Sequence, residues 1–185
     1  MSATSTGNGK VVVNRCMSLD GFIAAPGGRL DWMQGFGEQN DEVTELIPQI
    51  GAVLAGRHTY DVGSTQSRPE FRGPYGGAFS GTMFVLTHHP PKDTSVTFLS
   101  GDITQAVTTA AEAAGEKYVA LLGADVARQA MEAELVDDVL IHMVPILLGD
   151  GVRLYTKPGG DERHLELISV SRAVQVVNLR FGFVG

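Results

Sequence analysis

Short apolar runs alternate with polar or glycine-rich segments along most of the chain, and each run has the length of one strand. The first run spans residues 11–19, and the longest spans residues 139–148, although Pro145 interrupts it. Uninterrupted apolar runs are typical of strands that are buried on both faces, as in a parallel sheet. The same pattern predicts further strands at residues 51–55, 83–87, 96–99 and 118–122.

Helices are predicted between several of these strands, where apolar residues recur every three or four positions. The clearest helix lies between Asp102 and Gly115. Asp102 is a typical N-cap, with Gln105 three residues later, and Gly115 is a typical helix end. Further helices are predicted to begin at Asn40 or Asp41, at residue 57 and after Gly123.

Two segments do not fit this alternation of strands and helices. Residues 63–81 are rich in Gly, Ser and Pro and predict a long loop, which in a compact domain is usually functional or mobile. From about residue 163 the chain predicts two strands that meet near Arg172, and the last strand has one polar face. The whole order predicts an α/β fold: a mostly parallel central sheet flanked by helices, with a C-terminal antiparallel hairpin.

Length and charge restrict the class of protein. The chain has 185 residues, so we expect one domain at 10–185, preceded by a polar, disordered tail at 1–9. Its net charge of -7 argues against uniform attraction to nucleic acid or to an anionic membrane. No apolar run approaches the length of a membrane-spanning helix, and residues 1–9 lack the features of a signal peptide.

The cysteine content also restricts the class of protein. Cys16 is the single cysteine, which excludes a disulfide framework and a multi-cysteine zinc site. The sequence therefore predicts a cytoplasmic protein whose partner is a small molecule. Cys16 itself lies in a predicted strand and is expected to be inert, and His142 is expected to be a hydrogen-bonded core histidine.

Candidate functional residues follow the carboxyl ends of the predicted strands, where α/β sheets bind their ligands. At Gly123 to Val126 a strand passes through glycine directly into a helix, whose first N–H groups would attract an anion. A tight turn without a ligand explains this segment about equally well. Asp125 opposes the anion interpretation unless its carboxylate turns outward.

Two further strand ends carry groups that bind phosphate. Gly56 is followed by Arg57, His58 and Thr59, and an arginine with a hydroxyl group suits phosphate. Thr87 and His88 follow the strand at 83–87 in the same way. The alternative for the segment after Gly56 is a surface turn with one salt bridge. The alternative for Thr87 and His88 is the polar start of a loop.

Asp20 follows the first strand and precedes the apolar residues Phe22, Ile23 and Ala24. A carboxylate in this place would put a polar group beside a flat apolar ligand. The alternative is that Asp20 and Gly21 form an ordinary turn.

Taken together, these segments resemble a known family. The segments are MSLDGFIAAPGGRLDW (17–32), GRHTYD (56–61), FVLTHHPP (84–91) and LLGADVARQAMEAELVDDVLIHMVPILLGDGVRLY (121–155). Their order and spacing resemble those of the dihydrofolate-reductase-like proteins related to the C-terminal reductase domain of the bifunctional riboflavin-biosynthesis deaminase-reductase. The resemblance covers nearly everything after the tail.

This resemblance implies a dihydrofolate-reductase-like fold and an NADPH site. It implies that the cofactor phosphates meet Gly56, Arg57, His58 and Thr59, and that the adenosine ribose and its 2′-phosphate meet Thr87 and His88. It implies that the pyrophosphate meets Gly123, Ala124, Asp125 and Val126, and that Phe22, Ile23 and Ala24 belong to a mobile loop over the nicotinamide.

The chain also departs from the family pattern. Leu122 stands where the family often has a first glycine, and the substrate acid of dihydrofolate reductases has no secure counterpart. Asp20 is the first candidate for a proton-relaying group and Asp31 the second; the acids at 41, 42 and 45 are further possibilities. The segment at 63–81 has no counterpart either.

The sequence thus predicts an NADPH-dependent reductase that passes hydride to a small flat heterocyclic or imine-like substrate. Such a reaction would be similar to that of the 5-amino-6-(5-phosphoribosylamino)uracil reductase of riboflavin biosynthesis. The alternatives are an NADP-binding module without catalysis and a true dihydrofolate reductase. A homodimer is also predicted. The apolar strand at 179–184 would promote aggregation if it formed an exposed edge of the sheet, so we expect a second copy to cover it.

Overall fold

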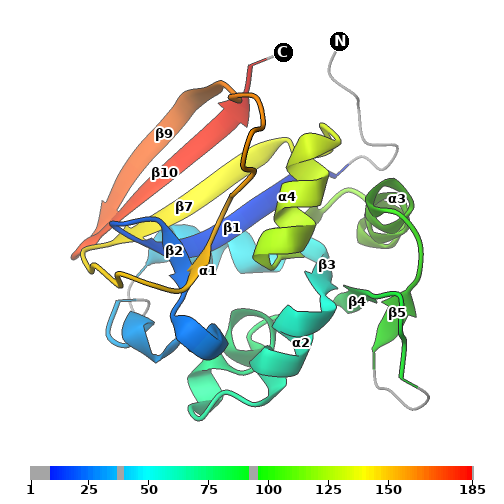
Figure 1. Cartoon of the computed structure of the whole chain (residues 1–185), viewed down its shortest axis with the longest axis horizontal. Coiled ribbons are helices and arrows are strands. Elements are labelled where there is room, and N and C mark those ends of the chain that lie inside the picture. Colours follow the sequence, from blue (N-terminus) through cyan, green and yellow to red (C-terminus); the bar gives the residue numbers. More distant parts are fainter. Residues whose placement is uncertain (1–8, 37–39, 92–95, 185) are drawn as a thin grey trace.

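The computed structural model describes residues 9–36, 40–91 and 96–184, which form one large sheet covered by helices (Figure 1). Eight strands form this sheet in the order β5-β4-β3-β6-β1-β7-β10-β9. Their bounds are β1 Val11–Ser18, β3 Ile50–Gly56, β4 Thr82–Leu86, β5 Thr97–Leu99, β6 Tyr118–Leu122, β7 Asp138–Val144, β9 Leu165–Ala173 and β10 Val176–Phe183. Two short strands, β2 Phe22–Ala24 and β8 Val152–Arg153, pair separately.

The predicted mixture of strand directions is confirmed. All neighbours from β5 to β7 run parallel, whereas β10 runs antiparallel to both β7 and β9. The parallel strands consist of the apolar runs identified in the sequence, and most of their residues are buried. The C-terminal hairpin extends this sheet at one edge.

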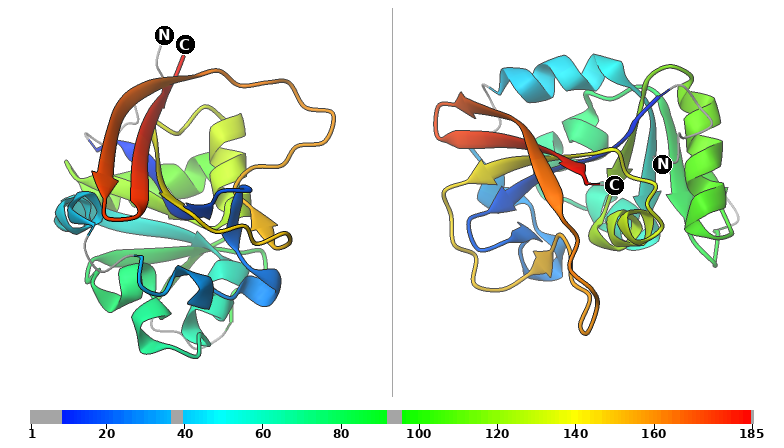
Figure 2. Two further views of the ribbon diagram at one scale, coloured as in Figure 1. Left: turned by 90° about the vertical axis from the view of Figure 1, so that its left-hand side faces the viewer. Right: turned by 90° about the horizontal axis from the view of Figure 1, so that it is seen from above.

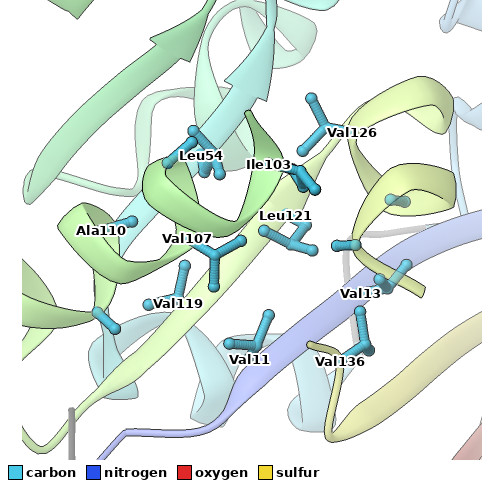
Figure 3. Close-up of a cluster of buried hydrophobic side chains, with 14 of the residues drawn as sticks. Val11, Val13, Leu54, Ile103, Val107, Ala110, Val119, Leu121, Val126 and Val136 are labelled. Carbon is cyan, nitrogen blue, oxygen red and sulfur yellow. The ribbon is translucent and has the colours of Figure 1, made fainter. Parts of the chain in front are cut away.

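Helices cover both faces of the sheet (Figure 2). Helices α3 (Ile103–Ala114) and α4 (Ala124–Glu132) lie on one face, where Val13, Leu121 and Val107 belong to the larger core cluster (Figure 3). Helix α1 (Asp41–Leu46) lies on the other face, over a smaller cluster around Val53 and Leu140. Helix α2 (Arg57–Ser64) follows β3 directly.

The ends of several elements differ from the sequence-based expectation. β7 ends at Val144, before Pro145, so the predicted strand at 139–148 is four residues too long. Asp102 caps α3 as predicted, since its carboxylate accepts a hydrogen bond of 2.9 Å from the N–H of Gln105. Asn40 stands at the N-cap of α1 but makes no side-chain cap; its amide is buried elsewhere. The segment at 63–81 contains two short 3-10 turns, Pro69–Phe71 and Pro74–Gly77.

The predicted tail at 1–9 lies outside the described residues except for Gly9, which is buried against Lys117. A buried residue thus stands two positions before the first β-strand. Among the helices in the described part of the chain, none is long and apolar enough to cross a membrane.

The edge strand is β9 and not β10, which corrects the prediction made for residues 179–184. β10 lies between β7 and β9, so its backbone is paired on both sides. β9 leaves Leu165, Leu167 and Val170 with 42%, 56% and 56% of their surface exposed. The exposed apolar edge that would favour a homodimer is therefore β9 and not β10.

Candidate functional site

The starts of helices α2 and α4 lie side by side at the carboxyl ends of β3 and β6. A Cβ built on Gly123 would overlap the hydroxyl of Thr59, and one built on Gly56 would lie 3.3 Å from the Cγ2 of Val126. Gly123 has a φ of 110°, a conformation that glycine adopts at little cost. The structure thus brings two of the predicted phosphate segments together.

Neither helix start is capped by a side chain. The N-cap residues are Gly56 and Gly123, and both lack a side-chain hydrogen bond to the first turn, unlike Asp102 in α3. Uncapped N–H groups together with the helix dipole attract anions. The carboxylate of Asp125 does not fill this role, since it accepts hydrogen bonds from Arg128 (2.7 Å) and Gln129 (2.8 Å) along its own helix.

Arg57 joins α2 to the ends of β4 and β5. Its Nε donates to both oxygens of Asp61 at 2.8 Å, and its Nη1 donates to the carbonyl of His89 at 3.2 Å. Its guanidinium also lies 5.8 Å from the centre of the Phe98 ring. These contacts hold a half-buried cation beside the two helix starts.

Thr87 lies next to this cation, at the end of β4. Its N–H donates to the carbonyl of Leu99 at 2.9 Å, and its hydroxyl accepts a hydrogen bond from the N–H of His89 at 3.2 Å. The side chains of His58 and His88 are exposed to solvent. Arg57, Thr87 and the two histidines are therefore accessible from one edge of the sheet.

A cavity of about 120 Å³ adjoins Thr87 and was not predicted from the sequence. It lies between the ends of β4 and β5 and the first turns of α3, and its walls include Leu86, Leu99 and Ala106. A flat aromatic ring suits such a partly apolar pocket. No motif marks it, because its lining residues come from Leu86 and from a second stretch at 99–109.

Asp20 holds a turn together. Its carboxylate accepts hydrogen bonds from the Ser18 hydroxyl (2.6 Å) and from the N–H groups of Leu148 (3.0 Å) and Gly149 (2.7 Å). The bond from Ser18, with those from the two backbone groups, lowers the pKa of Asp20 to about 2. The carboxylate is thus ionised at neutral pH and links the end of β1 to the segment after β7.

The segment predicted to be a mobile loop over the nicotinamide is the short strand β2, paired with β8. Phe22 and Ile23 are buried, and only Ala24 is partly exposed. The guanidinium of Arg153 covers the Phe22 ring at 4.4 Å from its centre. Strand pairing holds this segment in place, so only Ala24 can present its side chain to a ligand without rearrangement.

Asp31, the second acid predicted to relay a proton, lies at the surface. It begins the 3-10 turn Asp31–Met33 and accepts a hydrogen bond of 3.3 Å from Arg29. The same segment is fastened to the end of α2, because Leu30 donates its N–H to the side chain of Gln66 at 3.3 Å. No contact among the described residues joins Asp31 to Asp20.

The central strand β1 loses one of its neighbours halfway along its length. It pairs with β7 as far as Ser18, but with β6 only through Val13, because β6 turns into α4 after Leu122. The residues of β1 beyond this point, Arg15, Cys16 and Met17, are partly exposed although they lie in the middle of the sheet. In α/β sheets, ligands bind beyond the carboxyl ends of the strands, at places where the order of the strands changes.

A buried polar network lies on the α1 side of the sheet. The ring nitrogens of His142 lie 2.7 Å from Asn14 Oδ1 and 2.6 Å from Asn178 Oδ1. Asn40 and Asn178 exchange two amide hydrogen bonds of 2.8 and 3.0 Å. Burial lowers the pKa of His142, and the hydrogen bond with Asn178 opposes this effect. The expectation of a hydrogen-bonded core histidine is confirmed.

A second cavity, larger than the one at Leu86 and Leu99, lies elsewhere. Its volume is about 370 Å³, and it opens beneath α1 near the amino end of β6, far along the strands from the helix starts. Its walls include Asp41, Glu42, Glu45, Tyr118 and Arg180. Three carboxylates at its mouth make it a poor site for an anionic cofactor.

Comparisons with known proteins agree with this architecture. The family model described as the RibD C-terminal domain matches residues 9–179. The chain is 27% identical over 175 residues to the uncharacterized protein YwjB of Bacillus subtilis (strain 168), which covers 93% of this chain and 97% of that protein.

Solved structures show the same fold. A Thermotoga maritima diaminohydroxyphosphoribosylaminopyrimidine deaminase/5-amino-6-(5-phosphoribosylamino)uracil reductase superposes with a TM-score of 0.69 at 15% identity, covering 95% of this chain and 57% of that chain. Enterococcus faecalis dihydrofolate reductase, complexed with NADP(H), superposes with a TM-score of 0.66 at 13% identity, covering 97% and 99%. These similarities confirm the dihydrofolate-reductase-like fold.

Proposed function

Since the chain belongs to the RibD C-terminal domain family, we propose that it is an NADPH-dependent reductase acting on a small flat heterocyclic or imine-like substrate. The observation that carries the proposal is the pairing of two uncapped helix starts, at Gly56 and Gly123, beside the cation of Arg57. This arrangement offers N–H donors and one positive charge to a ligand with several phosphates.

The residues present fit NADPH. Gly123 would let the pyrophosphate approach the first turn of α4, and Thr59 would add a hydroxyl donor from α2. Arg57, Thr87 and His88 would hold the 2′-phosphate, and the cavity at Leu86 and Leu99 would take the adenine. When bound, NADPH supplies the hydride; the protein orients it and excludes water.

The proton has two candidate donors, Asp20 and Asp31. Asp20 already accepts three hydrogen bonds and is ionised at neutral pH, so it acts in this proposal as a positioning residue for the turn at Leu148 and Gly149. Asp31, an exposed carboxylate paired with Arg29, is then the remaining candidate for proton donor. General acid catalysis contributes about 10²- to 10⁴-fold, so Asp31→Asn should impair turnover without abolishing it.

The substrate is proposed from the relatives. The T. maritima protein is described as a 5-amino-6-(5-phosphoribosylamino)uracil reductase, which favours a similar pyrimidine or another flat imine-like compound. The alternative of true folate reduction is supported by fold similarity alone. The alternative of a non-catalytic NADP-binding module is favoured by one observation, the full engagement of Asp20 in a structural turn.

A double variant tests the cofactor site. Arg57→Ala with Thr87→Ala should weaken NADPH binding by about 10- to 100-fold, because hydrogen bonds to charged groups are lost. NADH binding should change much less, since NADH lacks the 2′-phosphate. Arg163→Ala, which removes an equal charge at an exposed pair with Glu134, serves as the control. Unchanged NADPH affinity in the double variant would refute the assignment. Protein-dependent NADPH oxidation with an identified reduced product would exclude the non-catalytic alternative.

A further inference from the structure

A continuous chain of polar side chains crosses the α1 side of the sheet. Its inner members are buried, since Asn14, His142 and Asn178 expose 3% or less of their surface. Its outer end, Glu42, is partly exposed and lines the cavity beneath α1 together with Ser171. The successive members are Asn14 of β1, His142 of β7, Asn178 of β10, Ser171 of β9 and Glu42 of α1. The chain therefore links the middle of the sheet to a carboxylate at the surface.

The direction of these hydrogen bonds is set at the carboxylate end. An ionised carboxylate only accepts, so the Ser171 hydroxyl gives its one hydrogen to Glu42. The Ser171 oxygen must then accept from Asn178, whose Nδ2 lies 2.9 Å away. The carbonyl oxygen of Asn178 therefore faces the Nδ1 of His142 at 2.6 Å, and this nitrogen must carry a hydrogen. Asn40 agrees with this orientation, because its Nδ2 donates to the same oxygen at 2.8 Å.

The other ring nitrogen of His142 decides the orientation of Asn14. In a neutral ring with its hydrogen on Nδ1, the Nε2 is an acceptor, yet the Oδ1 of Asn14 lies 2.7 Å from it. The Nδ2 of Asn14 meanwhile is buried and makes no hydrogen bond. Turning the amide over lets Nδ2 donate to Nε2 and removes both faults, and only hydrogen bonding distinguishes the two ends of an asparagine amide. A doubly protonated ring is the alternative, but burial lowers the pKa of His142.

The turned amide also provides a partner for Tyr75, whose hydroxyl is buried and makes no hydrogen bond. The Tyr75 ring packs against the smaller core cluster, which includes Val12. Residues two apart in a strand share a face, so Asn14 lies on the same side of β1 as Val12. Burial raises the pKa of Tyr75 to about 12, and a side-chain hydrogen bond with Asn14 is among the effects that oppose this shift. The Tyr75 hydroxyl thus has an acceptor in the Oδ1 of the turned Asn14.

We propose that Glu42 is a positioning residue that sets the direction of this whole chain, from the Tyr75 hydroxyl to its own carboxylate, and so holds His142 in the Nδ1–H tautomer. The opposite direction is the competing state. With a donor in place of the carboxylate, Ser171 would donate to Asn178, the amides would turn, and the ring hydrogen would move to Nε2. Both directions satisfy the buried groups, and the charge-assisted bond at Glu42 selects the first.

The consequence is a connection between α1 and the segment at 63–81. Tyr75 belongs to this segment and has a φ of 54°, which is uncommon for a residue with a side chain and needs support from its surroundings. The hydrogen bond to Asn14 gives part of that support, and its direction depends on Glu42. The inference does not rest on the proposed cofactor, because no member of the chain belongs to the proposed cofactor site.

The test is the tautomer of His142, measured on the full chain at neutral pH by nitrogen NMR of the imidazole ring. In the wild type the Nδ1–H form should exceed the Nε2–H form by about tenfold or more, since a charged acceptor strengthens the bond from Ser171. Glu42→Gln and Ser171→Ala should each bring this ratio within about threefold of unity. Glu45→Gln removes an equal charge from the same helix and cavity and should leave the ratio unchanged.

A second measurement tests whether the two ends of the chain are coupled. Tyr75 and Glu42 make no hydrogen bond with each other in the described part of the chain, so independent effects of Tyr75→Phe and Glu42→Gln on stability would add. We expect the unfolding equilibrium constant of the double variant to differ from the additive value by about 2- to 5-fold, because one break already loosens the chain.

Any one of four results would overturn the proposal. They are an Nε2–H or doubly protonated ring in the wild type, a ratio that Ser171→Ala leaves unchanged, an equal change in Glu45→Gln, and additive effects in the double variant. A merely structural role for Glu42 would alter stability without moving the hydrogen from one ring nitrogen of His142 to the other.

Discussion

The hydroxyl of Thr59 lies directly against Gly123, so that the first turns of α2 and α4 meet without room for a Cβ between them. This contact joins two segments that are 64 positions apart in the sequence. It brings the uncapped N–H groups at the starts of both helices to the same site. The proposed pyrophosphate site depends on it.

Gly123→Ala should therefore impair both stability and cofactor binding. The new Cβ would collide with Thr59, and alanine at a φ of 110° is strained. We expect a loss of more than about 1 kcal/mol in the free energy of unfolding and a fall of at least about tenfold in NADPH affinity. Gly159→Ala is the control, since Gly159 also has a positive φ but no atom within 4 Å of the added Cβ. Urea unfolding and fluorescence titration provide the two readouts, and equal effects in both variants would contradict the account.

Asp20 should stabilise the protein in a pH-dependent way. Its pKa is about 2 in the folded chain against 3.8 for a free side chain, so its contribution is complete above about pH 4 and is lost as the pH falls towards 2. Asp20→Asn should lower the Tm at neutral pH, and the difference from wild type should shrink on acidification. Asp161→Asn should show no such trend. A difference that stays constant down to pH 2 would mean that the three hydrogen bonds do not depend on the charge.

His142 should link stability to pH in a higher range. Because burial lowers its pKa below 6.5, the unfolded chain binds the proton more readily, and stability falls as the pH drops below about 6.5. His142→Leu should remove this part of the pH dependence. It should also cost about 1–3 kcal/mol, since it removes the hydrogen bonds between His142 and the side chains of Asn14 and Asn178 in a buried network. Urea unfolding at several pH values would measure both effects, and an unchanged pH slope in the variant would refute the assignment to His142.

The exposed edge strand should mediate dimerisation. Three apolar residues of β9 pair with alternate residues of β10, so they share one face of the sheet. The pairs are Leu165 with Phe183, Leu167 with Phe181 and Val170 with Leu179. Such an apolar row at an open edge favours pairing with a second copy. Light scattering should give twice the mass of one chain. Leu167→Lys with Val170→Lys should give a monomer, whereas Val174→Lys, at the exposed hairpin end, should not. A monomeric wild type at micromolar concentration would contradict this prediction.

The sequence predicted the sheet and its helices because each buried strand is a separate apolar run with glycine or a polar cap at its end. The segments at Gly56 and Gly123 do lie at strand ends, as predicted, although only the structure shows that Thr59 touches Gly123. The pairing of β2 with β8 was missed, because strands of three and two residues carry no periodic signal.

Asn14 was missed for a different reason. The pattern of residues 11–19 predicts one buried strand, although Asn14 and Arg15 interrupt the apolar run in the middle of this central strand. A polar residue inside a buried strand was the available signal. The position of Tyr75, which packs against the smaller core cluster, depends on the fold of the segment at 63–81 and leaves no mark in the sequence.

The most direct test of the central claim is calorimetric titration of the wild-type protein with NADPH and, separately, with NADH. The account predicts saturable NADPH binding that is at least about tenfold tighter than NADH binding, because the 2′-phosphate adds charge-assisted contacts with Arg57 and Thr87. Equal affinities would contradict the role of these two residues. No binding of either nucleotide would contradict the proposed function itself and leave the family fold without its cofactor.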